Sequence, residues 1–232
     1  MRRQVMMLAA MSLLICAAPY GRTEPGPDAN NPGVVDKARM DETRGDLARI
    51  RSDYTAAVSY YSAALRVSRQ DAALYNKLGI AELQLGDKGA AGKDFGKALK
   101  YNPDLTAALN NLGAVNLMQK KYRPAVGYLK RALAMDESAA ATHLNLAEAW
   151  FGLGNALAAQ EQYSAAAGAY RRALAIDPHL VDAHNNLGNV LLLTGQVPAA
   201  VAEYREALRL RPGDPALQKS LQLALEAQSN GR

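Results

Sequence analysis

The amino-acid sequence predicts an all-α fold in which helical repeats stack into a solenoid. Three observations support this prediction. The chain has 232 residues, of which 49% are hydrophobic and only 6% aromatic, and it is dominated by alanine and leucine, which favour helices. Stretches of about 14 residues carry apolar side chains at helical spacing. These stretches recur with a period of about 34 residues, which indicates a repeat architecture.

The first residues have the pattern of a secretory signal peptide, which we expect to span residues 1–21. A short positive segment, "MRRQ", precedes an uncharged apolar run from Val5 to Ala18. This run is shorter than the roughly 20 residues that cross a bilayer, and the small residues Ala17 and Ala18 suit cleavage. We therefore expect an exported protein, periplasmic or secreted, that meets a membrane only through this segment if it is uncleaved or lipidated.

Cys16 is the only cysteine of the chain and lies inside this segment. It leaves open a lipoprotein signal with a lipidated cysteine, although Ile15 is bulky where such signals usually carry a small residue. Cleavage beyond Cys16 leaves a mature chain without cysteine, so neither disulfides nor thiol catalysis are expected. A flexible linker rich in Pro, Gly, Asn and Asp follows at residues 22–35, and we expect the folded part to begin at Asp36.

The repeated unit is defined by residues that return in the same order. A Leu-Gly pair comes first, a small residue and a ring or leucine follow, and proline closes several units. We expect the small residues to lie where neighbouring helices approach most closely. The members are Leu78-Gly79, Leu112-Gly113 and Leu187-Gly188; then Ala91, Ala125, Ala166 and Ala200; then Phe95, Leu129 and Tyr204; and last Pro103, Pro178 and Pro212.

We divide the folded part, residues 36–228, into five repeats and a capping helix. The first repeat is degenerate because its first helix is polar, as expected at the end of a solenoid. The repeats span approximately 38–71, 72–105, 106–139, 140–180 and 181–214, the capping helix spans 214–228, and residues 229–232 are expected to be a disordered tail.

The pattern resembles the tetratricopeptide repeat (TPR) family over about residues 38–212. The Leu-Gly start, the two alanines that flank an aromatic residue, and the closing proline all stand in order. The resemblance implies a right-handed solenoid of helix-turn-helix units whose first helices line a concave groove. It also implies a non-catalytic scaffold that binds an extended peptide or a partner protein there.

The fourth repeat carries seven extra residues, and the stretch "HLNLAEAWFGLG" at 143–154 gives the same pattern twice. Seven residues advance a helix by nearly two full turns, so the extra turns keep the same face toward the core. We therefore expect one long first helix over residues 138–160. An alternative breaks the chain at Gly154-Asn155 and lengthens the second helix instead.

Asparagines recur in the middle of the first helices, where this residue is a mediocre helix former. An Asn side chain offers both donors and an acceptor, which can pair with a peptide backbone without reading its sequence. In some TPR proteins such a ladder holds extended peptides, and the resemblance carries over to Asn111, Asn145 and Asn186, with Lys77 interrupting the ladder. The candidate peptide-binding residues are Asn76, Lys77, Asn110, Asn111, Asn145, Asn185, Asn186 and Asn189.

The alternative is that these asparagines bond neighbouring helices or water. If they bind a peptide, replacing Asn111 or Asn186 by Ala is expected to weaken binding and to leave stability nearly unchanged, because Ala is the better helix former.

The sequence contains no pattern of catalytic or metal-binding residues. His143, His184 and Trp150 occupy one bulky column of the first helices, where packing explains them better than a metal site. There is no phosphate-binding glycine loop after a strand and no Ser/His/Asp or Cys/His set, so we expect neither an enzyme nor a cofactor. The net charge of +5 is small and basic pairs such as Arg171-Arg172 are scattered, which argues against a nucleic-acid partner.

These features favour an exported adaptor that binds a peptide or protein partner in its groove. The alternative is a membrane-tethered, lipoprotein-like assembly factor that uses the solenoid structurally. A third hypothesis is an accessory module of an enzyme complex.

Overall fold

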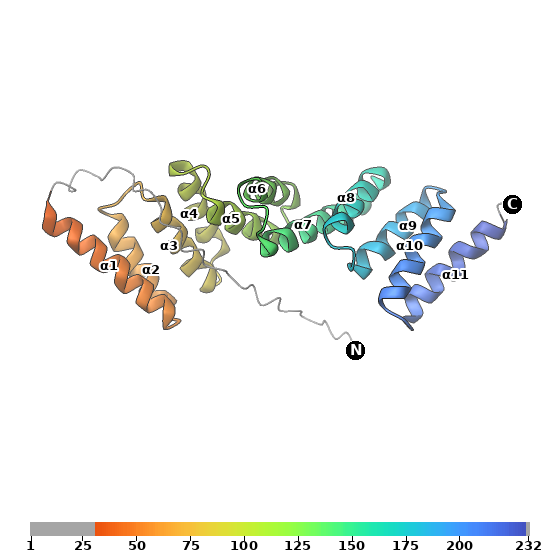
Figure 1. The fold of residues 1–232 in the computed structure, drawn as a ribbon, viewed down its shortest axis with the longest axis horizontal. Helices are drawn as coiled ribbons and strands as arrows, with labels where there is room; N and C mark the ends of the chain where they lie inside the picture. Colours follow the sequence, from red (N-terminus) through yellow and green to blue (C-terminus); the bar gives the residue numbers. More distant parts are fainter. Residues whose placement is uncertain (1–30, 231–232) are drawn as a thin grey trace. The chain divides into compact units, whose positions relative to one another are not determined.

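The computed structural model describes residues 31–230, which form eleven helices and no strand (Figure 1). This is the all-α fold of helical repeats that the sequence predicts. None of the helices in this range combines the length and the apolar composition that crossing a bilayer requires. The predicted signal peptide and most of the predicted linker lie outside the described residues.

The helices form five pairs and a final single helix, one pair for each predicted repeat. The second helices of the second to fifth repeats each have 14 residues, whereas the first helix of the fourth repeat is longer than those of its neighbours. The bounds are α1 (Pro32–Ile50), α2 (Tyr54–Leu65), α3 (Ala72–Gln84), α4 (Lys88–Tyr101), α5 (Thr106–Met118), α6 (Tyr122–Met135), α7 (Ala140–Ala158), α8 (Tyr163–Ile176), α9 (Val181–Leu193), α10 (Val197–Leu210) and α11 (Pro215–Asn230).

The helical region extends further at both ends than the sequence predicts. Helix α1 begins at Pro32 rather than Asp36, because the side chain of Asn31 caps it by accepting a 3.1 Å hydrogen bond from the backbone N–H of Gly33. Proline at the first helical position is harmless, since its missing N–H has no partner there in any helix. At the other end α11 continues to Asn230, so the predicted disordered tail does not begin at residue 229.

The structure divides into two compact units. The first comprises residues 31–115 and 131–141, and the second comprises 116–130 and 142–230. In the first unit α1 to α4 pack on one another in chain order, and in the second α8 to α11 do so. Each unit has its own apolar core, centred on Tyr61 and Leu78 in the first and on Tyr170, Leu187 and Tyr204 in the second.

In four of the five repeats a glycine of the first helix packs against an aromatic ring of the second helix. A Cβ added to Gly188 would lie 2.7 Å from the ring of Tyr204, and one added to Gly79 would lie 2.8 Å from the ring of Phe95. The same contact joins Gly45 to Tyr61 and Gly154 to Tyr170. The alanines predicted at close approaches are all fully buried, which confirms that they are packing residues: Ala91, Ala125, Ala166 and Ala200.

The seven extra residues of the fourth repeat lengthen its first helix. Helix α7 runs without a break through Gly154 and Asn155 to Ala158, so the alternative with a break at that point is wrong. The spacing of the turns between paired helices also places the insertion in α7. Each of these turns contains one residue with a left-handed backbone. These residues are Ser52, Gly86, Lys120, Glu161 and Gly195, and only the interval between Lys120 and Glu161 contains the extra seven residues.

Candidate functional site

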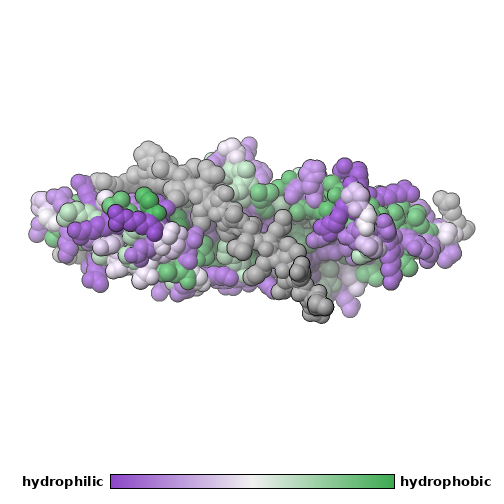
Figure 2. Space-filling model, turned by 90° about the horizontal axis from the view of Figure 1, so that it is seen from below, coloured by the Kyte–Doolittle hydropathy of each residue, from purple (hydrophilic) through white to green (hydrophobic). Residues whose placement is uncertain are grey.

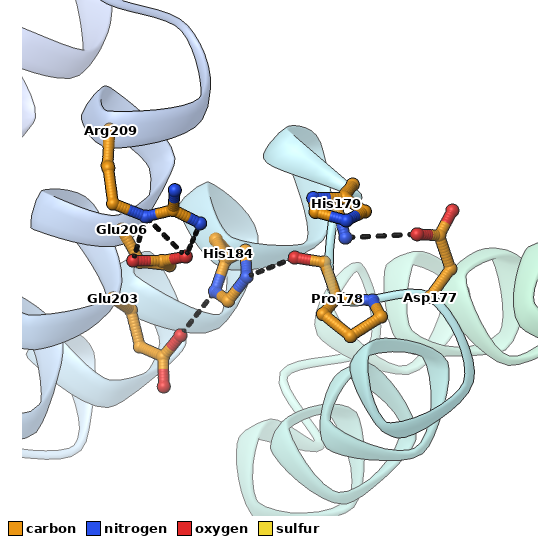
Figure 3. A network of polar contacts seen from close by, with 7 residues as sticks. All are labelled: Asp177, Pro178, His179, His184, Glu203, Glu206 and Arg209. Carbon is orange, nitrogen blue, oxygen red and sulfur yellow. Dashed lines mark hydrogen bonds and ion pairs between the residues drawn. The ribbon is translucent and has the colours of Figure 1, made fainter.

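Among residues 31–230, no group of three or more His, Cys, Asp or Glu side chains is placed to hold a metal ion. The buried His184 is held by two acceptors (Figure 3). Its Nδ1 lies 2.7 Å from a carboxylate oxygen of Glu203, and its Nε2 lies 3.1 Å from the carbonyl oxygen of Pro178. His184 therefore ties α9 to α10 and to the turn before α9, which is the packing role predicted for its column.

A cavity of about 340 Å³ in the second unit brings predicted binding residues together. It lies between α7, α8 and α9. Two of the predicted asparagines, Asn186 and Asn189, contribute to its wall. The lining residues are Asn155, Ala158, Tyr163, Tyr170, Asn186, Asn189, Val190 and Leu193.

Three amide side chains give this cavity its polar character. Oδ1 of Asn155 accepts hydrogen bonds from the hydroxyl of Tyr170 at 2.8 Å and from Nδ2 of Asn186 at 2.9 Å. Oδ1 of Asn189 accepts a bond of 2.7 Å from the hydroxyl of Tyr204. Because these bonds occupy the oxygens, the Nδ2 groups of Asn155 and Asn189 are left as donors without an acceptor within the described part of the chain.

The tyrosines in these bonds stay neutral hydroxyl donors. Burial raises the pKa of Tyr204 to about 12. Burial also raises the pKa of Tyr170, which a hydrogen bond with Asn186 offsets in part. At neutral pH each phenol therefore keeps the proton with which it orients its asparagine.

Asn155 was missed by the sequence analysis, although a signal for it exists. Where a glycine faces a tyrosine of its own repeat, a polar residue follows the glycine: Asp46 accepts from Tyr61 at 2.8 Å, as Asn155 and Asn189 do from their tyrosines. Where the ring is Phe95, which has no hydroxyl, the residue after the glycine is the apolar Ile80. Tyrosine and its acceptor thus change together from repeat to repeat.

The candidate residues of the first unit are engaged within the protein. Nδ2 of Asn111 donates a 3.0 Å bond to Oδ1 of Asn76, and both side chains are buried, with 4% and 9% exposure. This pair fits the alternative considered above, in which asparagines bond neighbouring helices. Asn110 also makes an interaction within the protein.

Lys77, which interrupts the ladder, is held by the first repeat. Its Nζ lies 2.9 Å from a carboxylate oxygen of Glu42 and 2.7 Å from one of Asp46. Burial lowers the pKa of Lys77, but the hydrogen bonds to Asp46 and Glu42 outweigh it and raise the pKa overall. Lys77 is thus a charged link between α1 and α3.

The remaining candidates lie in the second unit. Nδ2 of Asn185 donates to Oδ1 of Asn186 at 3.4 Å, while Oδ1 of Asn185 is buried and has no hydrogen-bond partner within the described residues. Asn145 is half-buried and makes an interaction within the protein. The structure therefore gathers only Asn186 and Asn189 into one cavity, together with the unpredicted Asn155.

Apolar surface borders these amides. Leu193 is 66% exposed at the cavity, and Val190 and Tyr163 also line it. On the face drawn in Figure 2, hydrophobic areas lie between hydrophilic ones, and single exposed apolar residues are normal in proteins. What distinguishes the cavity is that apolar side chains stand next to oriented amide donors, a combination typical of ligand sites.

Comparison with known sequences finds a single family. One tetratricopeptide repeat profile matches residues 43–99 and 151–215, and another tetratricopeptide repeat profile matches residues 104–179. No curated protein matches the chain.

Several solved structures share the fold. MamA protein is 22% identical with a TM-score of 0.58, over 75% of this chain and 92% of that one. MamA (41-end) from Desulfovibrio magneticus RS-1 is 25% identical with a TM-score of 0.56, over 78% and 98%. YrrB, described as a TPR protein with an unusual peptide-binding site, is 20% identical with a TM-score of 0.58, over 84% and 97%.

Proposed function

We propose that this chain, which belongs to the tetratricopeptide repeat family, holds an extended peptide of a partner protein in the cavity between α7, α8 and α9. Its repeats make it a protein-interaction scaffold, and proteins of this family are in general non-catalytic. The observation that carries the proposal is the pair of oriented amide donors, Asn155 and Asn189, beside exposed apolar surface.

The amides suit a peptide backbone. Each tyrosine hydroxyl occupies the Oδ1 of its asparagine, so Nδ2 points away from that bond and can donate to a peptide carbonyl. The position on α7 and that on α9 present equivalent donors from successive repeats. Donors of this kind hold an extended chain by its backbone, whatever its side chains are.

The apolar lining supplies the selectivity that the amides lack. Leu193, Val190 and Tyr163 offer a surface for one or two apolar side chains of the peptide. Burying such side chains contributes roughly 25 cal/mol per Å² of apolar surface. We therefore expect the bound segment to combine extended backbone with at least one bulky apolar residue. The peptide-binding site described for YrrB supports this class of function for a TPR protein.

The test uses Asn→Asp substitutions, because an aspartate keeps the oxygen that accepts from tyrosine and replaces the Nδ2 donor with a charged oxygen that cannot donate. Asp46 already plays this part with Tyr61, so the helix pair tolerates the change. Peptides are selected from a random library on the purified protein, and their affinities are measured by calorimetry. Asn155→Asp and Asn189→Asp should each weaken binding by about 0.5–1.5 kcal/mol.

A matched control separates the lost donor from the added charge. Asn102 lies in the first unit, outside the cavity, and its Oδ1 accepts a bond from the backbone of Asp104. Asn102→Asp therefore adds the same charge and keeps the hydrogen bond that its own Oδ1 accepts. If the cavity variants and this control bind the selected peptides equally well, the peptide does not use these amides and the proposal is wrong.

We also propose that the protein works outside the cytoplasm, after export by residues 1–21. This rests on the charged start, the apolar run and the small residues of the N-terminal segment. The alternative is a tethered form with lipid on Cys16. Mass spectrometry of the mature N-terminus distinguishes them: cleavage beyond Cys16 supports export as a free protein, and a diacylglyceryl mass on Cys16 supports the tethered assembly factor.

A further inference from the structure

A second hollow lies in the second unit, on the opposite face of α7 and α8. Its volume is about 440 Å³, within the range of ligand sites. We call it the Trp150 pocket. It is lined by Arg123, Val126, Trp150, Leu153, Leu157, Ala165, Gly168, Ala169 and Arg172.

Helical spacing places the two hollows on opposite sides. On α8, Ala165, Gly168 and Arg172 share one helical face and line the Trp150 pocket, whereas Tyr163 and Tyr170 lie on the other and line the first cavity. Helix α7 divides its residues in the same way, with Trp150 and Leu157 on one face and Asn155 on the other. A ligand of the Trp150 pocket therefore does not compete for the amides.

Comparison with the fifth repeat shows why the fourth repeat is hollow at the Trp150 pocket. Trp150 and Ala169 stand in the columns of His184 and Glu203, which fill the equivalent place with a 2.7 Å hydrogen-bonded pair (Figure 3). The fourth repeat has a methyl group at 169 in place of that carboxylate, and no side chain at Gly168. A Cβ added to Gly168 meets nothing within 4 Å, so the space is open.

The rim of the pocket is positively charged. The guanidinium carbon of Arg172 lies 4.6 Å from the centre of the Trp150 ring, an attractive cation–π arrangement. Arg123, on α6, also lines the pocket. Neither arginine has an acidic partner among residues 31–230, and no carboxylate lines the pocket. An apolar hollow with two unpaired guanidinium groups is complementary to an apolar group that carries negative charge nearby.

We propose that the Trp150 pocket binds a segment of a partner protein in which a bulky apolar side chain stands between acidic side chains. The apolar side chain enters the space over Gly168, beside Val126 and Leu153. The carboxylates pair with Arg123 and Arg172. The protein then has two docking points for partner polypeptides on opposite faces of one helix pair.

Trp150 provides the readout, because it is the only tryptophan of the chain. The probe is a capped peptide with the sequence Ser-Asp-Phe-Asp-Ser, titrated into the purified protein while the Trp150 emission is recorded. We expect the Trp150 emission to change with peptide concentration until it saturates. Peptides with Asn-Phe-Asn or Asp-Ala-Asp at the centre should bind at least about tenfold more weakly, since each lacks one of the two complementary parts.

Two kinds of variant locate the binding. Gly168→Leu fills the pocket and should abolish the change in Trp150 emission on addition of the peptide. Gly127→Leu is the matched control, since Gly127 stands in the same column of α6, also meets nothing within 4 Å and does not line the pocket. Arg123→Gln and Arg172→Gln should each weaken binding about tenfold, the usual effect of losing a charge-assisted bond. They alter only exposed side chains, so they keep the test valid even if Gly168→Leu does not fold.

Several results would overturn the proposal. One is equal binding of the Asn-Phe-Asn peptide, and another is equal binding by a folded Gly168→Leu variant. Loss of binding in Asn189→Asp with none in Arg172→Gln would place the peptide in the first cavity instead. A change of Trp150 emission with protein concentration alone would show that a second copy of the chain fills the pocket.

Discussion

The hydroxyl of Tyr204 donates a 2.7 Å hydrogen bond to Oδ1 of Asn189, while the ring of the same tyrosine covers Gly188. One side chain thus fixes both the close approach of α9 to α10 and the orientation of an amide in the candidate site. The stability of this helix pair and the function proposed for the cavity depend on the same contact.

The first prediction concerns the glycine under this ring. A methyl group at Gly188 would come within 2.7 Å of Tyr204, so Gly188→Ala should lower the free energy of unfolding by about 1–3 kcal/mol, despite the better helix propensity of Ala. Gly127→Ala, where a Cβ meets nothing within 4 Å, should instead stabilise by up to about 1 kcal/mol. Urea unfolding compares the two. Equal stabilities would contradict the close contact.

The second prediction replaces the sequence-based expectation for Asn111→Ala. Asn111 is 4% exposed and donates to the buried Oδ1 of Asn76, so its loss leaves a buried acceptor without a donor and should cost about 1–3 kcal/mol. Asn186→Ala removes a bond at an exposed site and should cost less than about 1 kcal/mol, because water replaces the lost partner. Thermal melts of the two variants measure this difference in stability. An unchanged melting temperature for Asn111→Ala would show that the buried pair does not stabilise the fold.

The third prediction is a dependence of stability on pH. Burial, and next the neighbouring carboxylate of Asp94, raise the pKa of Glu82 from 4.5 to about 7. The folded chain thus holds this proton more tightly than the unfolded chain. Its stabilising contribution is full below about pH 4.5 and is lost as the pH rises through about 7.

Glu82→Gln isolates this effect, because an amide cannot ionise. The stability of the variant relative to the natural chain should be greater at about pH 8 than at about pH 5.5, as measured by urea unfolding at both values. A relative stability that is the same at both values would show that Glu82 does not change its charge over this range.

The fourth prediction concerns the link between α1 and α3. Lys77 pairs with Glu42 and Asp46 through side chains that are about a third exposed, so solvent screens the attraction. Lys77→Gln should lower the free energy of unfolding by about 1 kcal/mol at low salt, and by less in 1 M salt, where the screening length is about 3 Å. A loss that does not depend on salt would assign the effect to packing of the lysine stem.

Much of the fold could be predicted from the sequence because local rules determine it. The recurrent glycine and the aromatic residue that faces it hold four of the five helix pairs together, and the seven-residue shift keeps Leu146 and Leu153 on one face. The start of α1 was placed too late, since the many helix-breaking residues before it conceal a cap at Asn31 followed by a tolerated proline.

The candidate site was only partly predictable, because a column in the sequence does not reveal which partner each residue finds. Asn111 and Asn186 stand in the same column, yet one is buried against Asn76 and the other lies in a cavity. Trp150, predicted to be a packing residue, does pack against the core but is only partly buried, because the small side chains facing it on α8 leave a hollow. That hollow depends on Gly168 and Ala169 together, in a different helix.

The most direct test of the proposed function observes the side-chain amides themselves. Nuclear magnetic resonance resolves the Nδ2–H₂ signals of asparagines, which are titrated with a library-selected peptide. The signals of Asn155 and Asn189 are predicted to shift in proportion to the bound fraction, while that of Asn102 stays in place. If the peptide saturates the protein and the signals of Asn155 and Asn189 do not move, the peptide binds elsewhere and this cavity is not the binding site.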